Sequence, residues 1–130
     1  MTPTGTRGDI WARAALAAAV AVNLVVLYWP RPVSDGGVPY ADKIVHVAIF
    51  AAVAVTALRV RVRLAWMVGL LAVHAVSSEL VQHWLLANRT GDPADVAADL
   101  VGVALGVVVA WKLAARTAVA ATRSGGSLSA

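Results

Sequence analysis

Residues 64–86 of the chain read LAWMVGLLAVHAVSSELVQHWLL. This apolar run is longer than the roughly 20 residues that an α-helix needs to cross the hydrocarbon of a bilayer. One acid, Glu79, interrupts the run about two helical turns from its end. An ionised side chain at the centre of a span costs roughly 2.5–3.5 kcal/mol on insertion scales, and neither capping nor snorkelling explains an acid at this depth. The run therefore predicts a transmembrane helix with a functional carboxylate.

Three other apolar segments accompany this one. Together the four segments cover about residues 11–29, 42–58, 64–87 and 93–115. The second segment is the shortest, and it reaches the length of a span only when its polar beginning, from Tyr40, is included. The chain is 60% hydrophobic and 14% charged, whereas soluble domains carry about 25% charged residues. We therefore expect an all-α integral membrane protein, a four-transmembrane-helix bundle.

The charged residues gather at the two ends of these segments. One end collects five acids against two bases, and the other collects eight bases against one acid. Arg59, Arg61 and Arg63 crowd the short link between the second and third segments, and such an excess of arginine marks the cytoplasmic side of a membrane protein. Both termini are basic and fall on that side. We expect both termini to be cytoplasmic and the protein to lie in the bacterial plasma membrane, crossing it several times.

The basic pI of about 10.4 is attributed to these cytoplasmic anchors. We therefore expect membrane lipids as partners and no nucleic acid, while a homo-oligomer is left open. The absence of cysteine excludes a disulfide framework, a thiolate metal site and a cysteine nucleophile. We predict one domain over residues 1–116 and a mobile cytoplasmic tail over residues 117–130, where the apolar periodicity ends.

The first segment resembles a secretory signal peptide, because Arg7 and Arg13 precede an apolar run. Its end, YWPRP at residues 28–32, has no small-x-small cleavage pattern, so we interpret the segment as a retained span. Asn23 in this segment and His74 in the third are interpreted as residues that hydrogen-bond helix to helix.

Two pairs of residues on the second and fourth segments are assigned structural roles. Asp42 and Asp92 stand at the beginnings of these segments, so each is interpreted first as a helix cap. Pro93 follows Asp92 at a position where proline suits the first turn of a helix. Gly102 and Gly106 are four residues apart on one helix face, a spacing that lets another helix approach closely.

Polar residues from three spans fall at one depth near the outer side of the membrane. Asp42 and His46 lie one helical turn apart, and Asp95 and Asp99 share a face of the fourth helix. The polar residues expected to meet are Asp42, Lys43, His46, Ser78, Glu79, Gln82, Arg89, Asp95 and Asp99. With Asp92 included, five acids face two bases at this end, an excess that predicts a bound cation, shared protons or a cationic partner.

Three motifs occur in order along this polar set. They are Asp42-Lys43-x-x-His46-x-x-x-Phe50, then Ser78-Glu79-x-x-Gln82, then Arg89 with Asp95 six residues later and Gly102 beyond. Together they resemble the VanZ-like family of small bacterial membrane proteins, named for a component linked to teicoplanin resistance. The resemblance covers about residues 41–106.

The resemblance implies an envelope role, with lowered susceptibility to glycopeptide antibiotics of the teicoplanin type. It also implies that the polar family positions in this chain are Asp42, Lys43, His46, Ser78, Glu79, Gln82, Arg89 and Asp95. The chain departs from the family's usual pattern at Asp99, where the family usually carries asparagine. An added acid there either strengthens a cation site or changes which group carries a proton.

The leading hypothesis for the function is recognition of a lipid or lipid-linked cell-wall precursor headgroup in an outward-facing polar pocket. Lys43 and Arg89 suit phosphate in that pocket. The residues assigned to substrate binding are Asp42, Lys43, Ser78, Gln82, Arg89 and Asp99.

A second hypothesis is an integral membrane hydrolase or transferase, for which Glu79, His46 and Asp95 are the candidate catalytic residues. A divalent cation is one candidate cofactor, but spacing alone assigns no metal and no ligand set. The third hypothesis is a small ion- or proton-coupled transporter, which four spans without an inverted repeat support less.

Overall fold

The computed structural model describes residues 7–29, 39–86 and 91–126, with residues 121–126 described by backbone alone. Four helices make up these ranges: α1 (Arg7–Tyr28), α2 (Ala41–Arg59), α3 (Leu64–Leu85) and α4 (Pro93–Gly126). Each is long and apolar enough to cross a membrane, and no strand occurs in the described ranges. The expected all-helical fold with four spans is confirmed. The cytoplasmic location of the termini stays a prediction.

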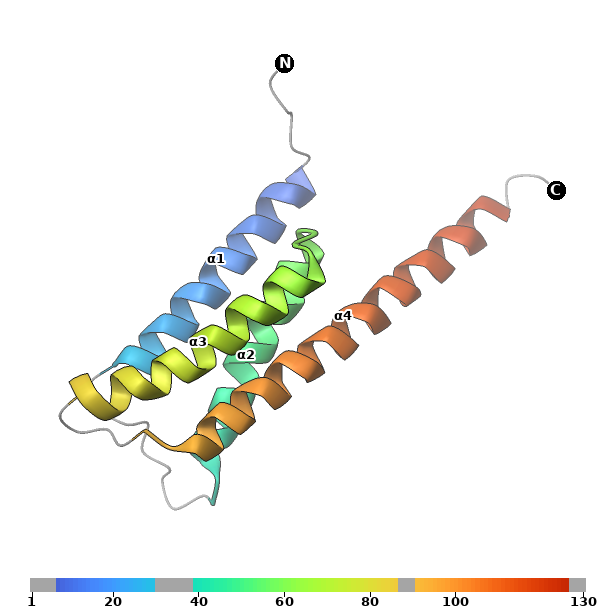
Figure 1. Cartoon of the computed structure of the whole chain (residues 1–130). Helices are drawn as coiled ribbons and strands as arrows, with labels where there is room; N and C mark the ends of the chain where they lie inside the picture. The colour runs from blue at the N-terminus through green and yellow to red at the C-terminus, as the bar shows by residue number, and fades with distance from the viewer. Residues whose placement is uncertain (1–6, 30–38, 87–90, 127–130) are drawn as a thin grey trace.

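Helix α2 is the centre of the bundle. It contacts α1, α3 and α4, and its contact with α4 is the most extensive between any two helices. Figure 1 shows α4 running beside α2 and extending past the other helices toward the C-terminus. This arrangement places the beginnings of α2 and α4 and the end of α3 at the same end of the bundle.

Local backbone features set where these helices begin and turn. At the start of α4, Oδ1 of Asp92 accepts a hydrogen bond of 2.9 Å from the backbone N–H of Ala94, so Asp92 caps the helix as expected. Asp42 does not cap α2: the cap position is Tyr40, without a side-chain hydrogen bond and with a left-handed φ of 61°. Arg61 has a φ of 64° in the tight turn that returns the chain from α2 to α3.

Helix α4 is longer than its apolar segment. The predicted span ends near residue 115, whereas the helix continues to Gly126. Alanine and arginine are strong helix formers, so the helix persists after the hydropathy of the chain has fallen. The first part of the predicted tail is therefore helical, and residues 127–130 lie outside the described ranges.

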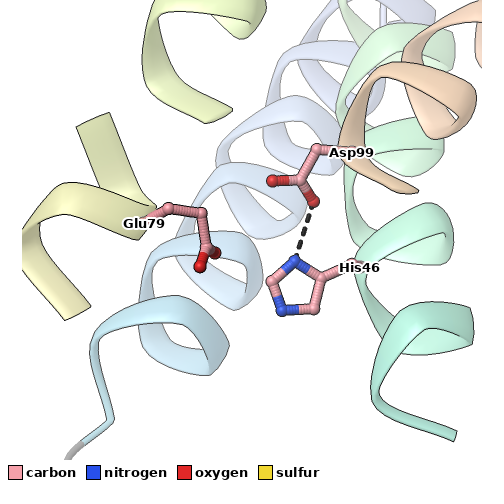
Figure 2. A group of neighbouring side chains, drawn as sticks. All are labelled: His46, Glu79 and Asp99. Carbon is pink, nitrogen blue, oxygen red and sulfur yellow. Dashed lines mark hydrogen bonds and ion pairs between the residues drawn. The ribbon is translucent and has the colours of Figure 1, made fainter. Parts of the chain in front are cut away.

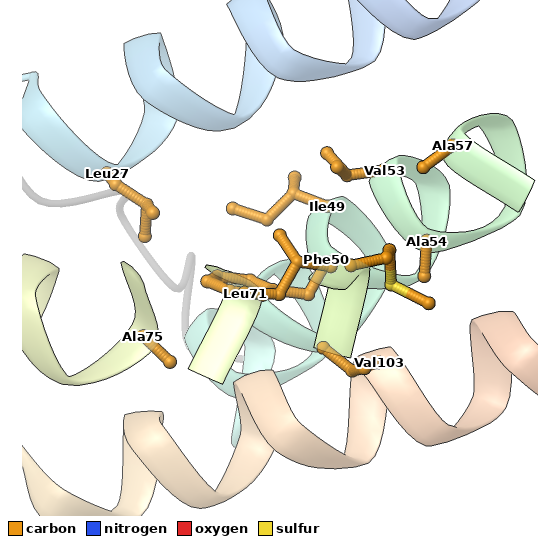
Figure 3. Close-up of a cluster of buried hydrophobic side chains, with 10 residues drawn as sticks. Leu27, Ile49, Phe50, Val53, Ala54, Ala57, Leu71, Ala75 and Val103 are labelled. Carbon is orange, nitrogen blue, oxygen red and sulfur yellow. The ribbon is translucent and has the colours of Figure 1, made fainter. Parts of the chain in front are cut away.

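Small and aliphatic side chains fill the space between the helices. Phe50 and Leu27 are fully buried at its centre. Figure 3 shows the buried cluster, whose labelled members are Leu27, Ile49, Phe50, Val53, Ala54, Ala57, Leu71, Ala75 and Val103. Many large apolar side chains point outward instead, such as Val73 at 66% exposure and Leu70 at 64%. Apolar residues on the outside suit a lipid environment better than water.

The closest approach between two helices occurs at Gly102 and Gly106 of α4. A Cβ atom added at Gly102 would lie 2.5 Å from the backbone oxygen of Val47. One added at Gly106 would lie 2.6 Å from Cβ of Ala54. The prediction that these glycines serve helix packing is confirmed, and the helix that they approach is α2.

Candidate functional site

Three helices bring ionisable side chains together inside the bundle. His46 comes from α2, Glu79 from α3, and Asp95 and Asp99 from the first turns of α4. Their exposed fractions are 4% for His46, 6% for Glu79, 8% for Asp95 and 0% for Asp99. Figure 2 shows the side chains of Glu79 and Asp99 reaching toward the imidazole of His46 from two other helices.

His46 and Asp99 form the shortest contact in this group. Nδ1 of His46 lies 2.9 Å from Oδ1 of Asp99. A carboxylate oxygen only accepts, so the imidazole donates through Nδ1–H, and a neutral ring then carries its free lone pair on Nε2. Nε2 lies 4.0 Å from Oδ2 of Asp95. Asp99 thus orients the imidazole of His46, a group that can exchange a proton or bind a cation.

Glu79 uses only one of its two oxygens within the described residues. Oε2 accepts a hydrogen bond of 2.9 Å from the backbone N–H of Asp92, which ties α3 to the beginning of α4. Oε1 of Glu79 is buried and has no hydrogen-bond partner among the described residues. The same holds for Oδ2 of Asp99. Within the part of the chain that the structure describes, two carboxylate oxygens are thus buried without a donor.

Lys43 lies at the exposed edge of this group, where its ammonium contacts three carboxylates. Its Nζ lies 2.7 Å from Oδ1 of Asp95, 2.9 Å from Oδ2 of Asp92 and 3.0 Å from Oδ2 of Asp42. The Lys43 ammonium also lowers the pKa of the Asp92 carboxyl, which lies between the helices, below its ordinary value of 3.8. Since an ammonium group has three donors, Lys43 is fully engaged by carboxylates in this structure.

Exposure rises from the inside of the group to its edge. The side chain of Asp95 is 11% exposed, that of Lys43 is 25% exposed, and those of Asp42 and Asp92 are 47% and 46% exposed. The ion pairs around Lys43 therefore separate the buried group of His46, Glu79 and Asp99 from the surroundings of the bundle.

Three polar residues spaced four apart on α3, His74, Ser78 and Gln82, have different partners. Ser78 is fully buried and donates its hydroxyl to the backbone oxygen of Ala75, a bond of 2.9 Å within its own helix. Gln82 is 2% exposed. His74 pairs through Nε2 with Oδ1 of Asn23 at 2.8 Å, which confirms the expected hydrogen bond between α1 and α3.

Two features of this end escaped the sequence interpretation. Asp92 is interpreted first as a cap, yet it also contacts Lys43 and donates its N–H to Glu79. Lys43 was assigned to phosphate, yet its partners are acids of α2 and α4. The sequence signal for both was the presence of acids at the beginnings of two helices that lie side by side. Arg89, the other predicted phosphate contact, lies outside the described residues.

Comparisons with known proteins agree with the resemblance drawn from the motifs. A model of the VanZ/LLP1 family matches residues 2–115. A search of curated proteins found no match, and neither did a search of solved structures. Because the family match covers most of the chain, from before α1 to within α4, this multi-pass membrane protein belongs to the VanZ/LLP1 family.

Proposed function

We propose that this protein is a cell-envelope factor that recognises the polar headgroup of a membrane lipid or lipid-linked cell-wall precursor. The observation that supports the proposal is the burial of His46, Glu79 and Asp99 together, at one depth, by three helices. Ionisable groups inside membrane spans are costly and are retained mainly where they bind, pair or transfer protons. In the proposed topology this end of the bundle faces outward, where such headgroups lie.

The charge of the site suggests which part of a headgroup it contacts. Lys43 is engaged by three carboxylates, while Asp42 and Asp92 are half-exposed at the edge. Carboxylates accept hydrogen bonds, so a headgroup with hydroxyl or amino donors, such as a sugar or a peptide amine, suits this edge. Arg89 and the outward-facing pocket stay predictions, and Arg89 is the proposed contact for the phosphate of such a lipid.

Binding of lipids to the protein in nanodiscs tests the proposal. Native mass spectrometry is expected to detect a retained lipid with a donor-rich headgroup on the wild-type protein. Asp42→Asn and Asp92→Asn, which change the two half-exposed carboxylates at the edge, are expected to weaken its retention by about 10-fold or more, since a hydrogen bond to a charged group contributes roughly 1.5–3 kcal/mol. His74→Gln, on α3 but paired with Asn23, serves as the control and is expected to retain the lipid.

Equal retention by Asp42→Asn, Asp92→Asn and wild type would remove the support for this function. The proposed physiological consequence is lowered susceptibility to glycopeptides of the teicoplanin type. It is tested by comparing the inhibitory concentration in a susceptible host that expresses wild type or Glu79→Gln at equal membrane levels. The wild type alone is expected to raise that concentration.

A second candidate function is an integral membrane hydrolase or transferase. It is favoured by the 2.9 Å contact between His46 and Asp99, which orients an imidazole whose Nε2 can accept a proton. Glu79 is the proposed partner in that proton transfer. Turnover of a lipid-linked substrate that is abolished by His46→Gln but kept by His74→Gln would distinguish an enzyme from a binding protein.

A further inference from the structure

The geometry points to a divalent-cation site formed by His46, Glu79 and Asp99. We infer that one cation binds between a ring nitrogen of His46 and a carboxylate oxygen of each acid. This site goes beyond headgroup recognition and stands whether or not a headgroup binds, because it involves only residues inside the bundle.

The spacing of the three side chains suits a single ion. One ligand atom from each residue lies within 4.8 Å of the other two. Nitrogen and oxygen ligands sit about 2.0–2.2 Å from an ion such as Zn²⁺, so small side-chain rotations bring all three to one centre. Figure 2 shows Glu79 and Asp99 approaching the imidazole from separate helices, with the three side chains converging on one space.

Unsatisfied oxygens provide an independent observation. Oε1 of Glu79 and Oδ2 of Asp99 are buried and have no hydrogen-bond partner among the described residues. Glu79 is 6% exposed and Asp99 is 0% exposed. Leaving a buried polar atom without a partner costs free energy, more so for a charged group. A cation between these oxygens would satisfy both.

Charge favours a cation of two positive charges. A neutral His46 with two carboxylates has a formal charge of two negatives, which a divalent ion neutralises within a medium that penalises isolated charge. Lys43 does not meet this need, because its ammonium contacts Asp42, Asp92 and Asp95 instead. The inner group therefore holds a negative charge that the described basic residues leave uncompensated.

The mixture of ligands narrows the kind of ion. Imidazole suits Zn²⁺ and other transition metals, whereas carboxylates also accept Mn²⁺, Mg²⁺ and Ca²⁺. One imidazole with two carboxylates favours Zn²⁺ or Mn²⁺ over the ions that prefer oxygen alone.

Metal binding to the purified full chain in detergent tests this site. We expect about one Zn²⁺ or Mn²⁺ per chain by elemental analysis, removal of the ion by a chelator, and its return on titration. Glu79→Gln and Asp99→Asn are expected to weaken binding by at least about 100-fold, beyond the 10–100-fold typical for groups that only support a ligand. In Asp99→Asn the amide oxygen still accepts from His46, so the charge changes while the hydrogen bond persists.

Two variants control for general effects of the substitutions. His74→Gln removes a histidine that pairs with Asn23, and Asp42→Asn removes an acid from the exposed edge of the same end. Both are expected to bind the ion as the wild type does. The assignment is overturned if Glu79→Gln binds the ion with the affinity of the wild type, or if the control variants lose as much affinity for the ion as Glu79→Gln does.

A measurement on the wild type alone covers the case in which a variant does not fold. Titration with Co²⁺ is expected to give visible absorption bands that saturate at about one equivalent and that Zn²⁺ displaces. Bound metal is also expected to raise the unfolding temperature, because a ligand of the folded state stabilises it. The absence of saturable binding by the folded wild type rejects the site. If the wild type binds the metal but retains no lipid, the result would count against the proposed function and leave the metal site standing.

Discussion

At the scale of single residues, Lys43 joins the beginnings of two helices through one ammonium group. Its three partners are Asp42 on α2, Asp92 before α4 and Asp95 in the first turn of α4. The contact with Asp95 is the most shielded, because that side chain is only 11% exposed. An ion pair in this position depends on both partners, since a shielded charge without a counter-ion is costly.

Replacing Lys43 with methionine is therefore expected to destabilise the protein. We expect a loss of about 1–3 kcal/mol, between the values for exposed and for buried ion pairs. Chemical unfolding in detergent measures it. Lys112→Met is the control, because Lys112 is exposed on α4 near the other end of the bundle and is expected to change little. Equal stability of Lys43→Met and wild type would contradict the structural role of the ion pairs.

The same residue predicts a dependence on pH. Lys43 lowers the pKa of Asp92 below 3.8, so the contact stabilises the fold above that pH. This stabilisation is lost as the pH falls through the lowered pKa of the folded state. We expect the unfolding temperature of the wild type to fall as the pH is lowered from about 4, and that of Lys43→Met to fall less. Thermal unfolding across this range measures both, and parallel curves would oppose the assignment.

At the scale of helices, the glycine contact between α2 and α4 positions the buried site. Asp99 lies one turn before Gly102 on α4, and His46 directly precedes Val47 on α2. Since Gly102 rests against the backbone of Val47, the separation of the two helices at this point sets the distance between Asp99 and His46.

Gly102→Ala tests this dependence. The added Cβ would meet the Val47 backbone at 2.5 Å, so the helices must separate, and overpacking of this kind costs about 1–3 kcal/mol. We expect Gly102→Ala both to lower the stability of the protein and to weaken its binding of the ion. Gly69→Ala is the matched control, because no atom lies within 4 Å of its added Cβ. That variant is expected to be as stable as the wild type or slightly more so, since alanine favours helix.

The sequence predicted the helices more reliably than their pairing. The spacing of Gly102 and Gly106 correctly predicted a close helix contact, but it did not identify α2 as the partner, because every helix offers apolar faces. Helix α4 continues past the predicted span to Gly126, because hydropathy locates the membrane rather than the end of a helix. The rotation of each helix decides which acids meet, and hydropathy leaves this rotation undetermined for spans that are apolar nearly all round.

At the scale of the whole molecule, the distribution of charge gives the bundle two unlike ends. The acidic group of α2, α3 and α4 lies at one end, and Arg59, Arg61 and Arg63 follow α2 at the other. The gathering of these residues at one end of the bundle was predictable, because charged residues near the ends of apolar runs are placed at the ends of the helices that those runs form. The engagement of Lys43 by acids was not, because it requires knowing which helices are neighbours.

Labelling of single cysteines tests the orientation. The chain has no cysteine, so each introduced residue is a unique reporter. Tyr40 is 74% exposed before α2, and a cysteine there is expected to react with a membrane-impermeant maleimide in intact cells. A cysteine at Arg61, in the turn between α2 and α3, is expected to react only after the membrane is opened. The reverse pattern would invert the topology and place the acidic site toward the cytoplasm.

The unbroken length of α4 has a mechanical consequence. At about 1.5 Å per residue its 34 residues form a rod of about 50 Å, longer than the roughly 30 Å of hydrocarbon in a bilayer. A tilt of about 5° pivoting near Asp95 would swing the far tip of such a rod by about 4 Å. If binding at the candidate site tilts α4, the C-terminal part of α4 would move at the opposite side of the membrane. A spin label at Ala120 would then register a changed distance to a second label on α1. An unchanged distance between the two labels after the ion is added would show that binding does not tilt α4.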